Sequence, residues 1–81
     1  MYKFVNIFKT TILSTQDMKL ALDTLYAFNI PLQATVDLLD EDKVLRVASD
    51  FNLTDRVQQQ LEERNFLCEV METYHLGEPL V

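Results

Sequence analysis

The stretch YKFVNIFKTTILSTQDM, residues 2–18, decides the fold, because it passes from the two-residue period of a strand to the start of a helix. Residues 2–12 alternate and are rich in the β-branched and aromatic types that favour strands. Ser14, followed three residues later by Asp17, resembles a capping box. Apolar residues then recur at helical spacing as far as Phe28, which predicts an amphipathic helix.

The same two patterns recur along the rest of the chain. The remaining predicted elements are a strand at 32–39, a polar turn at 40–42, a strand at 43–49, a helix capped by Asn52 or Thr54, and a strand at 67–76. Asn29 and Asn65 are suited to end the two helices in the left-handed conformation.

The order strand, helix, strand, strand, helix, strand predicts an α+β domain. We expect a ferredoxin-like βαββαβ sandwich, in which a four-stranded antiparallel sheet has two helices on one face. A single domain is expected over residues 1–76, with 77–81 as a loose C-terminal tail, because this segment contains Gly77 and Pro79.

Length and charge limit the classes of function. The chain has 81 residues and a formal net charge of −6, with acidic groups spread along it. This charge disfavours nucleic acid and anionic membranes as partners, and no apolar run is long enough for membrane insertion. The one cysteine, Cys68, cannot form an internal disulfide, which agrees with a reducing compartment. We therefore expect a small acidic cytoplasmic protein.

Three segments are similar to the heavy-metal-associated domain family of copper chaperones and transporter amino-terminal domains: FKTTILSTQDM at 8–18, VDLLDEDKVLRVASDF at 36–51 and RNFLCEVM at 64–71. The resemblance implies the ferredoxin-like fold and a metal-binding CxxC motif in the loop before the first helix. The two cysteine positions fall on Ser14 and Asp17, which do not form a site for a soft ion such as Cu(I). The chain resembles a degenerate member of the family in which Ser14 and Asp17 serve the helix as caps.

A relocated metal site is the alternative, in which the chain is a Cu or Zn carrier with unorthodox ligands. The remaining soft or borderline ligands are Cys68, Met71 and His75. Strand alternation predicts Cys68 and Met71 on opposite faces, and Met71 and His75 on one face but about 13 Å apart. Cys68 is expected in the core beside Phe66. We expect neither a metal partner nor a required cofactor.

An enzyme is not expected either. No Ser, Cys or second His is placed to form a nucleophile pair with His75. Residues 10–16 contain no Arg, Lys or Gly to bind phosphate. The predicted outward positions of the central strands also lack the aromatic residues with which an RNA-recognition module stacks bases.

The uncovered face of the predicted sheet is the candidate functional surface. Two helices cover only one face, and several apolar residues are predicted on the other. The predicted interaction residues are Val5, Ile7, Val44, Arg46, Leu67 and Met71. We therefore expect a domain that acts through contacts with a protein partner or as a homodimer.

Overall fold

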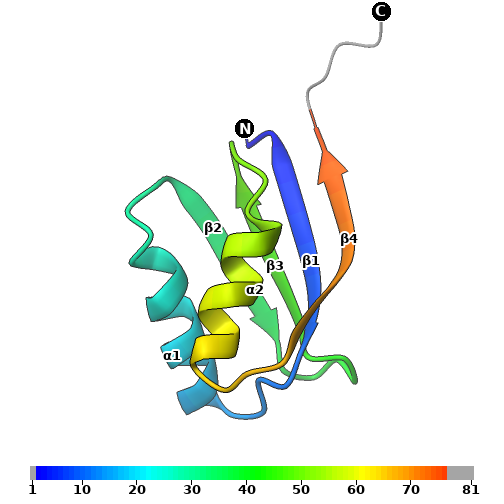
Figure 1. Ribbon diagram of the computed structural model, residues 1–81. Helices are drawn as coiled ribbons and strands as arrows, with labels where there is room; N and C mark the ends of the chain where they lie inside the picture. Colours follow the sequence, from blue (N-terminus) through cyan, green and yellow to red (C-terminus); the bar gives the residue numbers. More distant parts are fainter. Residues whose placement is uncertain (1, 77–81) are drawn as a thin grey trace, which may run out of the picture.

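Figure 1 shows the computed structural model of the chain, which describes residues 2–76. The elements are β1 (Phe4–Thr10), α1 (Thr15–Tyr26), β2 (Leu32–Asp37), β3 (Val44–Ser49), α2 (Thr54–Glu63) and β4 (Cys68–His75). The α+β class is confirmed, with one four-stranded antiparallel sheet and two helices. The tail predicted at 77–81 lies outside the described residues.

The sheet has the strand order β2-β3-β1-β4, so β1 and β3 are interior strands and β2 and β4 form the edges. All three neighbouring pairs are antiparallel. Phe8 of β1 pairs with Leu45 of β3 on one side and with Val70 of β4 on the other. This register sets which residues share each face of the sheet, because side chains alternate along a strand.

Both helices lie on the same side of the sheet (Figure 1). Phe8, Leu45 and Val47 on this side of the sheet are completely buried, as are Leu25 of α1 and Leu61 of α2. These residues belong to one apolar core, whose burial from water is the main force that holds the helices against the sheet. Among residues 2–76, no helix has the length and apolar character needed to cross a membrane.

Strand β4 contains an irregularity that the sequence pattern did not predict. Phe8 pairs with Val70, but the preceding residue Ile7 pairs with Glu72, so Met71 has no partner in β1. One extra residue in one strand is the mark of a β-bulge. The alternation of side chains is therefore shifted by one residue from Glu72 onward.

Three of the predicted helix ends agree with the structure. Asn29 and Asn65 follow the helices with φ angles of 61° and 68°, in the left-handed region that asparagine tolerates better than most residues. Ser14 is the N-cap of α1. The extended backbone at Ser14 allows its hydroxyl to accept a hydrogen bond from the Asp17 N–H at 3.0 Å.

The prediction for the start of α2 was wrong. The N-cap is Leu53, which makes no side-chain cap, rather than Asn52 or Thr54. Asn52 instead lies just outside the helix, where its Oδ1 accepts from the Thr54 N–H at 3.2 Å. The Leu53 N–H donates to Oδ1 of Asn6, a residue of β1. The helix start therefore has one local side-chain partner, Asn52, and one from a distant strand, Asn6.

Candidate functional site

The sheet face opposite the helices is the best candidate for a functional surface, and we call it the open face. The strand register places its residues in rows that run across the sheet. From β2 to β4, the first row consists of Gln33, Ala48, Val5 and Tyr74. The second row consists of Thr35, Arg46, Ile7 and Glu72. Beyond it, Asp37 lies beside Val44, and Lys9 lies beside Glu69. Its centre on β1 is apolar, and its rim is polar and charged.

The predicted interaction residues differ in how much surface they offer. Val5 and Ile7 are half-buried at the centre of the open face, and Arg46 is exposed beside Ile7. Val44 is only 6% exposed although it lies outside the main core cluster, so it supports its neighbours and provides little contact area. Met71, the bulge residue, is 51% exposed.

Leu67 lies just before β4 rather than within it. Its backbone N–H donates to Thr11 Oγ1 at 2.9 Å, and its carbonyl accepts from the Thr11 N–H at 3.2 Å. These two bonds continue the β1–β4 pairing beyond Thr10 and Cys68. Leu67 is strongly exposed at this end of the sheet, well away from the row that contains Ile7.

Two residues of the open face were missed by the sequence prediction. The β-bulge turns Glu72 and Tyr74 to this face, where they pair with Ile7 and Val5. Strict alternation from Cys68 predicts both of them on the helix side. Tyr74 is 45% exposed and is the largest side chain of the open face. A two-residue period gives no sign of an inserted residue, so only the register revealed them.

The same shift corrects the predicted placement of His75. Met71 and His75 were expected on one face, but His75 pairs with Phe4, whose strand neighbours at two-residue spacing face the helices. The two rings stack with centroids 4.4 Å apart and an angle of 3° between planes. His75 is therefore held on the helix side of the sheet, away from the open face.

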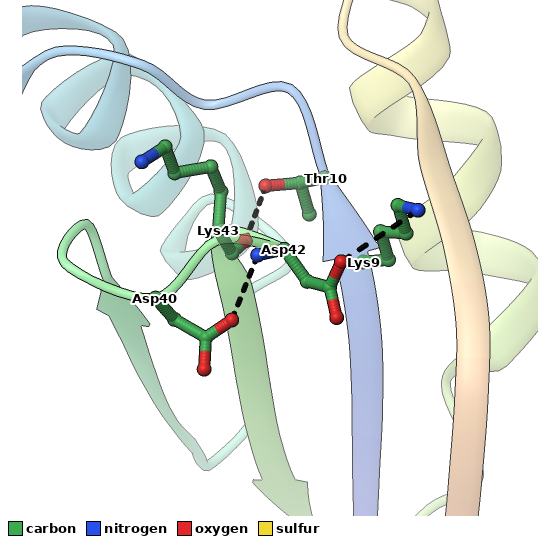
Figure 2. Close-up of polar contacts among 5 residues, drawn as sticks. All are labelled: Lys9, Thr10, Asp40, Asp42 and Lys43. Atoms are coloured by element: carbon green, nitrogen blue, oxygen red, sulfur yellow. Dashed lines mark hydrogen bonds and ion pairs between the residues drawn. The ribbon is translucent and has the colours of Figure 1, made fainter.

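The rim of the open face is fixed where the turn between β2 and β3 meets the end of β1 (Figure 2). Lys9 Nζ lies 3.6 Å from Asp42 Oδ1. The Asp42 N–H donates to Asp40 Oδ1 at 2.7 Å, and Lys43 adopts a φ angle of 49° to turn the chain into β3. These contacts explain how the turn closes without glycine.

Thr10 anchors this turn from the covered side. Its hydroxyl donates to the Lys43 carbonyl at 2.6 Å and accepts from the Ile12 N–H at 3.2 Å (Figure 2 shows the first of these). Its backbone N–H donates to the Asp42 carbonyl at 3.0 Å. The Thr10 side chain is nearly buried, so the polar groups that it satisfies would otherwise be costly. The arrangement is structural.

A second polar cluster surrounds Asn6, which the sequence analysis treated only as part of a strand. Asn6 is completely buried. Its amide nitrogen donates to Thr54 Oγ1 and Thr73 Oγ1, each at 3.0 Å, and to Asn52 Oδ1 at 3.2 Å. Its Oδ1 accepts from the Leu53 N–H at 3.2 Å. Asn6 thus connects β1 to β4 and to the start of α2.

The Asn6 cluster is complete within itself. Every buried side-chain nitrogen and oxygen of the described residues has a hydrogen-bond partner. A substrate or ion site commonly holds polar groups whose partner is the ligand. Among residues 2–76, no buried side-chain group of this kind is found.

Ser14 and Asp17 lie together at the start of α1. In addition to the cap, Asp17 Oδ2 accepts from the Leu13 N–H at 3.4 Å. Ser14 therefore satisfies a free donor of the first turn, and Asp17 satisfies the backbone donor of Leu13, just before the N-cap. Ser14 is exposed, and this arrangement accounts for both residues as helix caps.

Cys68 is buried in the core cluster with Phe66, as predicted. Burial raises the pKa of the Cys68 thiol to about 12, and the nearby charge of Glu62 adds to this shift. The thiolate is the form that binds metals, so this environment keeps Cys68 in the unreactive form. In residues 2–76, no three His, Cys, Asp or Glu side chains are grouped in a way that would hold a metal ion.

Comparisons with known proteins add no family to this description. No protein-family model matches the chain, and no curated protein matches it. A functional proposal therefore rests on the geometry of the open face.

Proposed function

We propose that the chain is a non-enzymatic ferredoxin-like domain, similar to heavy-metal-associated domains without their thiolate pair, which acts through protein contacts at its open face. The single observation that carries this proposal is the composition of that face. Half-buried Val5 and Ile7 form its centre, and no element among residues 2–76 covers them. A contiguous apolar centre with a charged rim is typical of protein contact surfaces.

The exposed side chains of β4 extend this apolar centre. Tyr74 pairs with Val5, and Met71 lies at the bulge beside Ile7. Tyrosine and methionine are enriched in protein interfaces, because tyrosine combines a large apolar area with a polar end and methionine adapts its shape. Bulges also occur where a strand directs side chains toward a functional surface.

The capping roles of Ser14 and Asp17 and the raised pKa of Cys68 favour this proposal over a metal carrier. The strand order and the order of the elements support the ferredoxin-like arrangement.

The test is the double variant Val5→Lys with Ile7→Lys. Two ammonium groups at the centre of the open face would have to be desolvated in any contact made there, so binding should be abolished rather than weakened. The isotope-labelled protein is mixed with an extract of cells that naturally produce it, and backbone amide NMR signals are followed. We expect signals of β1, β3 and β4 to broaden or shift for the wild type only.

The matched control is Gln16→Lys with Gln59→Lys, which adds the same two charges to exposed positions on the two helices. This control should behave as the wild type. Binding by the double variant Val5→Lys with Ile7→Lys at wild-type strength would contradict the proposal, as would changes confined to helix signals. Thermal unfolding of each variant establishes that the compared proteins are folded.

A further inference from the structure

We infer that the occupant of the open face is a second copy of this chain, packed face to face about a two-fold axis that runs along β1. The inference rests on the proposed function, and it names the partner for the same surface. The observation behind it is that the side chains flanking β1 on its two sides have opposite charge in one row and different size in the next.

The symmetry operation determines which residues meet. An axis that lies between the two faces and runs along β1 places each β1 residue against its own copy. It also exchanges the β3 side with the β4 side, because these strands flank β1. Ile7 therefore contacts Ile7 of the second copy, and Val5 contacts Val5.

The charges of the row through Ile7 are complementary under this operation. Arg46 flanks Ile7 on β3 and Glu72 flanks it on β4, so Arg46 of each copy comes opposite Glu72 of the other. Within one chain the two are separated by a strand, about 10 Å, and neither forms an ion pair among residues 2–76. A dimer contains this contact twice.

The next row is complementary in size. Ala48 flanks Val5 on β3, and Tyr74 flanks it on β4. The same axis places the large ring of each copy over the small side chain of the other. Close packing of large against small residues is what an interface core requires.

An arrangement with the axis across the strands fits less well. An axis across the strands, through the row of Ile7, would place Arg46 against Arg46 and Glu72 against Glu72. Like charges opposed in this way disfavour association. The axis along β1 brings Lys9 toward its own copy, but the ammonium group already has Asp42 as a partner at 3.6 Å.

The area agrees with a weak dimer. Because the axis runs along β1, the second copy opposes β3, β1 and β4 but not β2. Three strands about 4.8 Å apart and seven residues of about 3.4 Å each give a shared face of roughly 14 by 24 Å. Two such faces bury roughly 700 Å² in total, below the standard interface size and in the range of weak, transient contacts. We therefore expect a dimer that dissociates on dilution and that depends strongly on charge.

Charge reversal provides the test. In Arg46→Glu alone, both symmetric contacts become two opposed carboxylates, and in Glu72→Arg alone they become two opposed cations. Either variant should self-associate about 100-fold more weakly than the wild type, measured by sedimentation velocity over a concentration series. An equimolar mixture of the two variants restores both contacts and should dimerise as the wild type does.

The matched controls are Arg64→Glu and Glu63→Arg, which make the same charge changes at exposed positions at the end of α2. They should leave self-association unchanged. A wild type that stays monomeric at high concentration overturns the inference, and so does a mixture that stays monomeric. Unchanged self-association of the single variants overturns the axis along β1. The proposed function is decided separately: if the wild type stays monomeric alone but its β1, β3 and β4 signals change in extract, and those of Val5→Lys with Ile7→Lys do not, the proposed function stands with another protein as partner and the inference fails.

Discussion

The two helices of this domain begin in contrasting ways. At the start of α1 the partners are neighbours in the sequence: the Asp17 N–H donates to the Ser14 hydroxyl, and Asp17 Oδ2 accepts from the Leu13 N–H just before the N-cap. At the start of α2, the Leu53 N–H bonds to Asn6 Oδ1, 47 residues earlier in the chain. Partners for the free backbone donors are local at α1, whereas at α2 the local bond from the Thr54 N–H to Asn52 Oδ1 is joined by this tertiary bond.

Burial explains the difference. The α1 cap is exposed, so water competes with the Ser14 hydroxyl for the backbone donors. Leu53 is nearly buried against the sheet, and water does not reach its N–H. A buried donor without a partner costs more than an exposed one, so the start of α2 requires a polar side chain from inside the core.

The largest effect is expected at Asn6. Asn6→Ala removes the acceptor for the buried Leu53 N–H and the donor for Asn52, Thr54 and Thr73. We expect the free energy of unfolding to fall by about 1–3 kcal/mol, because a buried group loses its partner. Chemical denaturation measures this loss. Hydrogen exchange of the Leu53 amide should accelerate more than exchange in α1.

Thr73→Val is the matched control for Asn6→Ala. It removes one of three acceptors around the Asn6 amide nitrogen and leaves the bond to Leu53 intact. Its loss of stability should be smaller than that of Asn6→Ala. If Asn6→Ala costs no more than Thr73→Val, then α2 does not depend on the buried amide and the contrast between the two helix starts is removed.

The smaller expected effect at the start of α1 concerns Ser14. Ser14→Ala removes the acceptor for the Asp17 N–H, and we expect stability to fall by about 1 kcal/mol, as for an exposed N-cap. Thermal and chemical unfolding measure the loss. Binding at the open face should be unchanged in the extract experiment. Unchanged stability together with lost binding would make Ser14 a functional residue instead of a cap.

This contrast also shows how far sequence reasoning extends. The Ser14 cap and the left-handed residues Asn29 and Asn65 were predicted, because each depends on side chains close in the sequence. Asn6 was not recognised as the partner of α2, because its role depends on residues 46 to 67 positions away. A polar residue within an apolar strand is the only sign that the sequence offers.

The open face shows the same limit. Val5 and Ile7 were placed by alternation, since β1 is regular along its pairing with β3. Glu72 and Tyr74 were not, because the bulge at Met71 shifts one strand against another and leaves no mark in the two-residue pattern. Alternation therefore placed Val5 and Ile7 of β1 on the open face but missed Glu72 and Tyr74 of β4.

The smallest expected effect concerns a feature that the two helix starts share. Each has one acidic residue in its first turn, Asp17 in α1 and Asp55 in α2. Their charges interact with the positive end of a helix dipole, which does not depend on how the backbone donors are satisfied. Asp17→Asn and Asp55→Asn should therefore each lower stability by about 0.3–0.5 kcal/mol at low salt, and both losses should shrink at high salt as the charges are screened. Chemical denaturation at two salt concentrations measures these small differences.

Because asparagine retains an acceptor oxygen, the bond to the Leu13 N–H is preserved in Asp17→Asn. A loss at Asp17 that is much larger than at Asp55 and insensitive to salt would mean that this carboxylate has a role beyond the helix dipole, and the first loop would again become a candidate site.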